Sequence, residues 1–555
     1  MRSLGCTAGD EAPLALSGGR AALGLASPAP FDPLIITLFV KKGQLPSITR
    51  FWLHRVMTES VVSSYFTPRS AVERRRAPSL VDVSLDPVQR AAIDLPPERP
   101  LLVLGEAGHG KTTVLLHRVA RIWRASGRSL RTAILVPTEG LVRLVQPLLR
   151  RLGVDVEVWT FDRFAEKQAR QAFRRLPPES ELTPPSVMRL KRSPALRPML
   201  EEIASRGPGI IDDDADAPVR RSRSHVSRGD LQHLFGDRVL MEKVARAGAL
   251  PAHVVEDILE RTHIQFVLTT ERELAHVTDR ERLVAVDGRA LDEGTATGHA
   301  TTVDVEDYPV LFEIDRLRAE RRGAKPTAPR SFDLIAIDEA QELAPLELAL
   351  IGRSLVPGGS LVVSGDADQH TDETSTFLGW EAVMRELGVV DHATTTLEIG
   401  YRCPPEIVDL ARAVRDGTTK APVPIDVFED DRSLADALGP AMAEVLERDP
   451  RTSIAVVCRH PLPARRLAAM LRASVPARVV FDGRFLPRGP VQVSIVSDVK
   501  GLEFDYVLVP DADARTWPDD AAARRAMYVA ITRARHQVLL TCIGEPTPIV
   551  PRRGD

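Results

Sequence analysis

An eight-residue stretch, Gly105-Glu-Ala-Gly-His-Gly-Lys-Thr112, joins the apolar run Leu101–Leu104 to the amphipathic segment Thr112–Arg124. It fits the pattern G-x-x-x-x-G-K-[ST], and a strand before it with a helix after it is the setting of a phosphate-binding loop. Glycines let backbone N–H groups curve around an anion, and the helix N-terminus adds partial positive charge. The loop predicts a nucleotide site where Lys111 binds the β- and γ-phosphates and Thr112 is a Mg²⁺ ligand.

Two carboxylates follow a second apolar run, Leu334–Ile337. Asp338 and Glu339 would lie at the C-terminal edge of a buried strand. On its own, such a pair commonly marks only a helix N-terminus. Together with the phosphate loop, it predicts hydrolysis, with Asp338 holding Mg²⁺ through water and Glu339 polarising the attacking water.

From Leu85 onward, short apolar runs alternate with amphipathic segments. This alternation is typical of buried parallel strands separated by helices. A first series covers residues 101–104, 133–137, 156–161, 334–337 and 361–364, and a second covers 395–399, 454–458, 491–496, 506–509 and 538–542. We expect an α/β fold with two doubly wound parallel-sheet domains, the first over residues 85–164 plus 331–392 and the second over 393–550.

The remaining parts of the chain do not alternate in this way. Residues 165–330 contain the acidic run Asp212-Asp213-Asp214 and regain helical periodicity in 231–247 and 254–261, which predicts a mainly helical domain inserted into the first. Residues 1–84 are rich in Gly, Ala, Pro and Ser and predict a poorly ordered extension. A small docking helix near Phe51 is the alternative.

Composition excludes several classes of protein. The net charge of −3 over 555 residues excludes a strongly basic coat protein, although a basic groove could still bind nucleic acid. The four cysteines are scattered, which favours neither a disulfide framework nor a cysteine-type zinc site. No apolar run is long enough to cross a membrane, and Asp10 and Glu11 precede any apolar stretch, unlike the pattern of a secretory signal. We expect a cytoplasmic protein with no membrane partner.

Further motifs follow in the order found in one family. They are Leu85-Asp-Pro-Val-Gln89, Asp338-Glu-Ala-Gln341, Ser364-Gly-Asp-Ala-Asp-Gln369, Gly400-Tyr-Arg402, Lys500-Gly-Leu-Glu-Phe-Asp505 and Tyr528-Val-Ala-Ile-Thr-Arg-Ala-Arg535. With these segments the chain resembles superfamily 1 helicases of the UvrD/Rep type from about residue 85 to 545. The resemblance implies RecA-like domains of the P-loop NTPase class, ATP and Mg²⁺ as cofactors, single-stranded DNA as partner, 3′ to 5′ movement and a monomer.

The resemblance also implies roles for individual residues. Gln89 would read the adenine edge, Tyr401 would stack on adenine and Glu503 would lie near the ribose. Gln369, Arg402 and Arg533 would act on the γ-phosphate, beside Lys111 and Glu339. The glycine loop would bind the phosphates through residues Gly105, Glu106, Ala107, Gly108, His109, Gly110, Lys111 and Thr112, and Thr113 stands where the family often has an arginine against the adenine.

The chain departs from this family at several places. No aromatic residue follows Gln369 until Phe377, and Ile495 and Ser497 stand where the family has a threonine and a histidine. The interval between Arg402 and Lys500 leaves no room for the large second insertion of UvrD and Rep. Lys111–Ala120 and Val303–Leu311 look like the HelD-type branch, some of whose members release RNA polymerase from nucleic acid.

Three functions therefore compete. The first is an ATP-driven helicase or translocase on single-stranded DNA. The second is a HelD-like ATPase that remodels or releases RNA polymerase, with residues 165–330 as the partner-binding part. The third is a module that binds nucleotide without turnover, which the intact Lys111, Glu339, Arg402 and Arg533 disfavour.

Overall fold

The computed structural model describes residues 65–67, 81, 84–127, 129–173, 176–206, 226–266, 301–401, 403–418, 423–486 and 488–551. Most of the predicted N-terminal extension, including the alternative helix near Phe51, lies outside these residues. Within them, no helix combines the length and the apolar character needed to cross a membrane.

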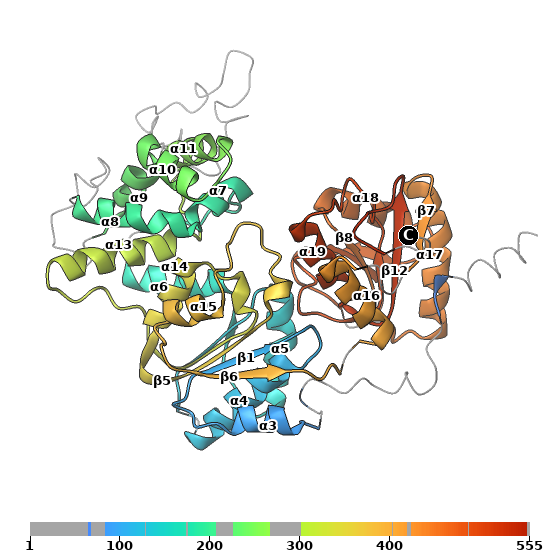
Figure 1. Ribbon diagram of the computed structural model, residues 1–555, viewed down its shortest axis with the longest axis horizontal. Helices are drawn as coiled ribbons and strands as arrows, with labels where there is room; N and C mark the ends of the chain where they lie inside the picture. The colour runs from blue at the N-terminus through green and yellow to red at the C-terminus, as the bar shows by residue number, and fades with distance from the viewer. Residues whose placement is uncertain are drawn as a thin grey trace, which may run out of the picture. The chain divides into compact units, whose positions relative to one another are not determined.

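The first sheet is fully parallel, in the order β3-β2-β4-β5-β1-β6 (Figure 1). Its strands are β1 (Leu101–Gly105), β2 (Thr132–Leu135), β3 (Val158–Trp159), β4 (Phe332–Ile337), β5 (Leu355–Gly365) and β6 (Ala393–Leu397). The helices around it are α3 (Pro87–Asp94), α4 (Lys111–Ala125), α5 (Glu139–Arg151), α14 (Pro345–Arg353) and α15 (Trp380–Glu386), with short 3₁₀ turns η5 (Ala340–Glu342) and η6 (Ala367–Gln369).

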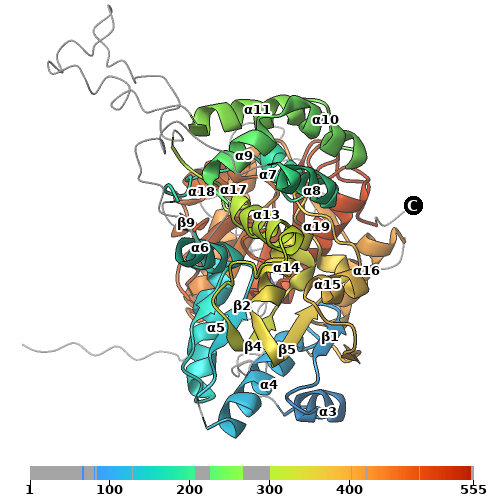
Figure 2. The same cartoon turned by 90° about the vertical axis from the view of Figure 1, so that its left-hand side faces the viewer.

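Successive residues along the strands of this sheet contribute to two separate hydrophobic cores. Leu101 and Val103 of β1 pack with apolar residues of α4, whereas Leu102 packs with residues of α14 and α15. Successive side chains of a strand point to opposite faces, so a strand covered on both sides must be apolar throughout. Figure 2 shows α3 and α4 on one side of the sheet and α13 and α14 on the other. This arrangement explains why the predicted strands are unbroken apolar runs.

Strand β6 corrects one expectation. The run 395–399 was predicted to open the second series, but Ala393–Leu397 pairs in parallel with β1 in the first sheet. Its residues are half-buried and exposed in turn, and only Leu397 is buried, because β6 is an edge strand. Since the chain leaves the first sheet only after this strand, the phosphate loop that follows β1 lies beside the end of β6.

Between β3 and β4 the described chain is mainly helical (Figure 1). The elements are α6 (Phe161–Ala172), α7 (Pro185–Lys191), η1 (Pro194–Leu196), α8 (Arg197–Ser205), α9 (Arg228–Phe235), α10 (Arg238–Ala247), α11 (His253–Phe266) and α13 (Asp307–Arg321). The segment Val303–Leu311, which carries part of the HelD-like resemblance, holds a buried lysine of α7 in place. Asp304 and Asp307 accept hydrogen bonds from Lys191 Nζ at 2.8 and 2.6 Å, and all three side chains are buried. A buried cation is tolerated only when it is paired in this way.

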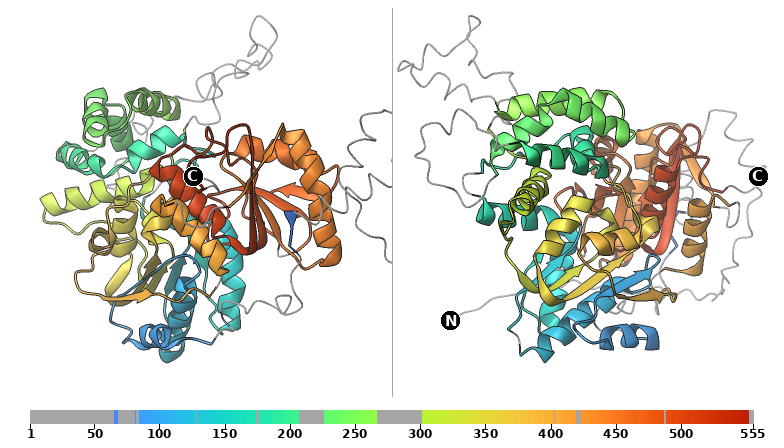
Figure 3. Two further views of the ribbon diagram at one scale, coloured as in Figure 1. Left: turned by 45° about the vertical axis from the view of Figure 1, so that its right-hand side comes forward. Right: turned by 60° about the vertical axis from the view of Figure 1, so that its left-hand side comes forward.

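The second sheet is also fully parallel, in the order β7-β12-β11-β8-β10-β9. Its strands are β7 (Ile425–Phe428), β8 (Ile454–Cys458), β9 (Ala477–Val479), β10 (Val491–Ile495), β11 (Phe504–Val509) and β12 (Ala534–Ile543). Its helices are α16 (Pro405–Asp416), α17 (Asp431–Arg448), α18 (Pro461–Leu471) and α19 (Ala521–Ile531). Figure 3 shows the red α19 and the orange α17 on opposite sides of this sheet. The edge strands β7 and β9 are short, and the apolar-run analysis did not predict them.

Residues 65–67 correct a second expectation. Phe66 is 4% exposed and packs edge-to-face on Tyr506 at 5.6 Å between ring centroids. The Tyr506 hydroxyl donates to Thr67 O at 2.7 Å, and the Gln537 side chain bonds the backbone on both sides of Phe66. This part of the predicted poorly ordered extension is therefore built into the core of the second sheet, because burial of an aromatic ring offsets the cost of ordering three residues.

Candidate active site

The glycine loop begins at the end of β1 and runs directly into α4. Gly108 and Gly110 have φ angles of 81° and 89°, a backbone region that glycine adopts without strain. A Cβ atom on Gly110 would also lie 2.6 Å from Gln89 Nε2. His109 Nδ1 is 2.7 Å from Leu397 O, which ties the loop to β6. The loop thus curves tightly around the N-terminus of α4, as the sequence predicted.

Lys111 is buried within the hollow of this loop. Its Nζ donates to the carbonyl oxygens of Gly105 at 2.7 Å and Glu106 at 3.1 Å, and it lies 4.0 Å from Asp366 Oδ2. The lysine is 6% exposed. A cation held at this place by neutral carbonyls is positioned to attract an anionic oxygen entering the loop.

Gln89 lies beside the loop, and its contact with adenine stays a prediction. It is the third residue of α3, and its amide and the Asp86 carboxylate cap each other's backbone N–H groups. Its Nε2 donates to His109 O at 3.4 Å. Tyr401, which is 55% exposed, donates its hydroxyl to Asp86 Oδ2 at 2.7 Å, and its backbone N–H donates to Gly108 O at 3.2 Å. Gln89 and Tyr401 therefore flank one side of the loop.

Arg118 holds the segment that carries Gln89. Its guanidinium donates to five carbonyl oxygens of residues 92–99 at 2.9 to 3.3 Å. Burial and the neighbouring Arg121 lower the pKa of Arg118 to about 10. The carbonyls at the end of α3 would otherwise be left without donors.

We expect Arg118→Met to lower the free energy of unfolding by about 3 kcal/mol, because several buried carbonyl groups lose their donor at once. Arg118→Lys, which retains the charge but not the fork of donors, should recover only part of that loss. Urea unfolding followed by circular dichroism measures both. Equal stability of the methionine variant and the wild type would show that water can replace the guanidinium.

Asp338 and Glu339 follow β4 and are both buried. Thr112 Oγ1 donates to Asp338 Oδ2 at 2.7 Å, and Ser364 Oγ donates to Asp338 Oδ1 at 2.6 Å. Gln341 Nε2 donates to Glu339 Oε2 at 2.6 Å. Glu339 has a φ of 55°, an uncommon value for a residue with a side chain, so its position is held against local strain.

The two carboxyl groups differ in their tendency to ionise. Burial and the adjacent Glu339 raise the pKa of Asp338. Burial also opposes ionisation of Glu339, but Lys111, Lys500 and Arg533 together lower the pKa of Glu339. The neighbouring positive charges therefore favour the ionised form of Glu339 more strongly than that of Asp338.

Gln369 joins the two sheets at this site. Its Nε2 donates to Asp366 Oδ2 at 2.7 Å, and its Oε1 accepts from Arg533 Nη2 at 2.9 Å. Arg533 comes from the turn between α19 and β12 and is 1% exposed. Lys500, from the loop between β10 and β11, donates to Gln369 O. Arg533 thus contacts the Gln369 side chain and Lys500 its backbone, and the same side chain contacts Asp366 beside Lys111.

Two arginines that the motifs did not indicate also reach the glycine loop. Arg412 Nη2 and Arg415 Nη1, both on α16, lie 2.8 and 2.9 Å from the Glu106 carboxylate. Although burial opposes ionisation of Glu106, these two guanidinium groups lower its pKa. Tyr528 Oη accepts from Ala107 N at 3.4 Å. The i, i+3 spacing of Arg412 and Arg415 was a signal for a shared helix face, but it did not reveal what that face meets.

The remaining predicted residues are placed as follows. Thr113 is buried within the first turn of α4. Glu503 lies just before β11, with its carboxylate 3.9 Å from the Arg535 guanidinium, so its ribose contact stays a prediction. Arg402 lies outside the described residues, and its role also stays a prediction.

The oxygen atoms beside Lys111 fit a magnesium ion. The Thr112 hydroxyl and the Asp338 carboxylate are hard oxygen donors only 2.7 Å apart at the start of α4. Within the described ranges, no three His, Cys, Asp or Glu side chains converge as a complete metal site. Magnesium sites often use one or two protein ligands together with phosphate oxygens and water, so magnesium binding here stays a prediction.

Comparison with known proteins bears on the second sheet. Residues 491–541 match the UvrD-like helicase C-terminal domain. Among solved structures, the C-terminal domain of a possible DNA helicase from Lactobacillus plantarum WCFS1 is 22% identical, and the match covers 28% of this chain and 94% of that chain with a TM-score of 0.24. No curated protein matches the sequence. The part of the second sheet that carries Lys500, Glu503 and Arg533 is thus similar to the C-terminal domain of UvrD-like helicases.

Proposed function

We propose that this protein is an ATP-dependent helicase or translocase of the UvrD type, built on two RecA-like P-loop domains. The observation that carries this proposal is the 2.9 Å hydrogen bond between Arg533 of the second sheet and Gln369 of the first. It joins a guanidinium group of the second domain to a glutamine that also contacts Asp366, whose carboxylate lies 4.0 Å from Lys111 Nζ. Such an arginine stabilises the charge that spreads over a γ-phosphoryl group in the transition state.

Each side chain then has a specific task. The glycine loop and Lys111 bind the phosphates of ATP, and Glu339 orients a water molecule and accepts its proton. Thr112 and Asp338 would hold Mg²⁺, which when bound neutralises charge on the phosphate oxygens. Gln369 lies between the carboxylate site and Arg533, so it can transmit the presence of the γ-phosphate to the second sheet. Gln89 and Tyr401 are positioned for the adenine base.

Movement follows from the division of the site between two sheets. Bound ATP would add its γ-phosphate to the contacts of Arg533 and Gln369, and loss of phosphate would weaken this link between the two sheets. Nucleic acid in contact with both sheets would be displaced in each cycle. On the resemblance to UvrD and Rep, we propose single-stranded DNA as the substrate, 3′ to 5′ as the direction and a monomer as the working form.

A second candidate, a HelD-like ATPase that remodels RNA polymerase, is favoured by the environment of Phe377. This is the first aromatic residue after Gln369, and it packs against Trp380 at 4.9 Å and His370 at 6.3 Å between ring centroids. A ring held in this way within the first-sheet domain offers little free face for a base to stack on. The proposal of a DNA helicase therefore needs a direct test.

The test is the rate of ATP hydrolysis with and without single-stranded DNA, beside Lys111→Ala. We expect the alanine variant to lose about 10²- to 10³-fold in rate, because one charged phosphate donor is removed. Stimulation of the wild type by single-stranded DNA supports a translocase. A rate of ATP hydrolysis that DNA does not change, together with co-purified RNA polymerase subunits, supports the HelD-like ATPase. No hydrolysis by the folded wild type would contradict both.

A further inference from the structure

A cleft of about 540 Å³ lies next to Asp338 and Glu339. It is formed at the carboxyl end of β2, the first turn of α6, the start of α13 and the loop before β11. Part of its wall is apolar, with Pro137, Phe161, Met188 and Leu343 among the lining residues. Its other lining residues are mostly acidic, which is unusual for a protein proposed to act on nucleic acid.

Some of these acids are neutralised within the protein. Arg192 binds Glu347 through two hydrogen bonds of 2.8 and 3.1 Å and also pairs with Asp372. Lys500 pairs with Glu342. Two cations therefore already satisfy three carboxylates of the cleft, and neither cation is free to meet an incoming anion.

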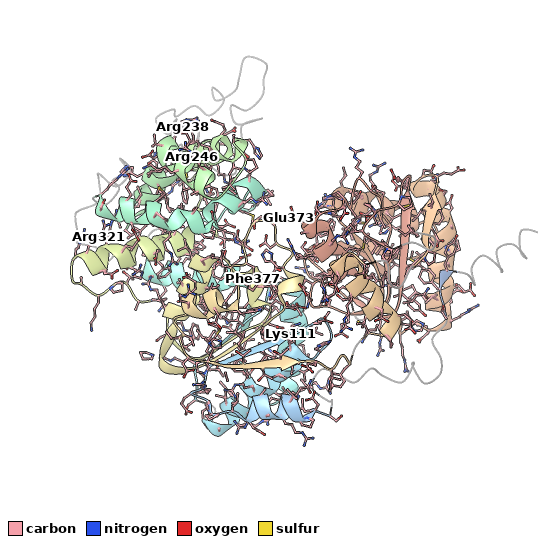
Figure 4. All side chains as sticks on the ribbon, viewed as in Figure 1. Lys111, Arg238, Arg246, Arg321, Glu373 and Phe377 are labelled. Atoms are coloured by element: carbon pink, nitrogen blue, oxygen red, sulfur yellow. The ribbon has the colours of Figure 1, made fainter. Side chains whose placement is uncertain are left out.

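Glu373, labelled in Figure 4, lies at the rim of the same cleft. Its carboxylate is 62% exposed and 3.4 Å from the Arg459 guanidinium. Asp338 and Glu339 also border the cleft, but they belong to the candidate active site. These groups add to the negative field without being available to a new ligand.

Three other carboxylates, those of Asp162, Glu306 and Asp498, line the cleft from three different elements. Within the described part of the chain, no lysine or arginine lies at ion-pair distance from any of them. Glu306 is 6% exposed, and its Oε2 has no hydrogen-bond partner. A buried carboxylate oxygen without a donor costs free energy, so its presence in a cleft points to a donor that arrives with a ligand.

These three carboxyl groups ionise less readily than free ones. Desolvation by the surrounding protein and the nearby carboxylate of Glu347 raise the pKa of Asp162 to about 6, although Arg192 acts in the opposite direction. Burial raises the pKa of Glu306 to about 7 against the opposing charges of Lys191 and Arg192, and it raises that of Asp498 to about 6. A bound cation would favour the charged form of each group and would lower these pKa values again.

We propose that this cleft binds the cationic end of an aliphatic chain, an ammonium or guanidinium group, as a lysine or arginine side chain of a partner protein presents it. The apolar wall suits the methylene stem, and Glu306, Asp162 and Asp498 suit the charged head. A phosphate backbone would meet carboxylates here.

The inference is independent of ATP hydrolysis and is tested by direct binding without nucleotide. The probe is a fluorescein-labelled arginine-rich peptide, and its matched control is the same peptide with citrulline, which has the same shape but no charge. The protein variants are Asp162→Asn combined with Glu306→Gln, and Asp391→Asn as control, because Asp391 is 77% exposed and pairs with Arg99 away from the cleft. Melting temperatures show that each variant is folded.

We expect the arginine peptide to bind and the double variant to weaken its binding by about tenfold or more, with Asp391→Asn unchanged. Affinity should also fall as the pH is lowered from about 8 to about 5.5, because the cleft carboxylates must lose protons to pair with the peptide. Displacement of the peptide by spermidine would support the same cation site with a free polyamine as its source. Lys111→Ala should bind the peptide normally, so failure of the proposed ATPase leaves this result unaffected.

Two results would overturn the inference. One is equal binding of the arginine and citrulline peptides, or equal binding by the wild type and the double variant. The other is displacement of the peptide by oligothymidine in the wild type but not in a variant with Lys500→Ala, which would assign the cleft to nucleic acid.

Discussion

Replacing Arg533 with alanine is expected to slow ATP hydrolysis by about 10³-fold, the lower end of the effect of an arginine that stabilises phosphoryl transfer. The guanidinium is buried, and it donates to Gln369 Oε1 and to Val529 O, both at 2.9 Å. These hydrogen bonds hold the guanidinium in one orientation beside Gln369. Binding of ATP should weaken much less than turnover, because the arginine acts chiefly on charge that develops during the reaction.

Two further variants make this result interpretable. Arg533→Lys retains the positive charge but not the planar fork, so its rate should lie between those of the wild type and the alanine variant. Arg515→Ala removes an exposed arginine of the same domain and should hydrolyse ATP normally. Steady-state phosphate release measures the rates, and thermal melting shows whether each variant is folded. A folded Arg533→Ala protein with the wild-type rate would reduce this residue to a structural link between α19 and Gln369.

Glu339→Gln is expected to lower the rate of hydrolysis by about 10²- to 10⁴-fold, the range of a general base. The substitution retains the shape of the side chain and its contact with Gln341, but it removes the proton acceptor. Affinity for ATP should stay within about threefold of the wild type, since the phosphates are held by the loop and Lys111 rather than by this carboxylate. Single-turnover hydrolysis and equilibrium nucleotide binding separate the two effects.

Glu381→Gln is the matched control for this substitution. Glu381 is an exposed residue in the first turn of α15, in the same domain, so the same chemical change there should leave the rate unchanged. If the Glu339→Gln variant released phosphate at the wild-type rate, the proposed mechanism would be wrong, and a module that only binds nucleotide would be favoured.

The parts of the site that are continuous in the chain were predictable from the sequence. The loop from Gly105 to Thr112 follows β1 and opens α4, and Asp338 and Glu339 end β4, as their spacing indicated. These features depend on local backbone geometry and on the alternation of strand and helix, which a few neighbouring residues determine. Most buried strands were likewise visible as apolar runs.

Features that depend on position within a sheet were less predictable. The apolar run containing β6 carried no signal for which sheet it would join, since a parallel strand pairs with residues far away in the chain. The short edge strands β7 and β9 lacked an unbroken apolar run because edge positions are partly exposed. The burial of Phe66 in the second sheet had no local signal either.

The chain's own residues thus specify a phosphate loop and a pair of carboxylates, because φ angles, caps and strand ends are set by adjacent side chains. Tertiary packing alone brings Arg533 to Gln369, 164 residues away, and Arg412 and Arg415 to Glu106. It also brings Asp162, Glu306 and Asp498 to the lining of one cleft. Contacts of this kind depend on how two sheets and their helices pack. Charged residues that pair across such long distances in the chain produce no repeating pattern in the sequence.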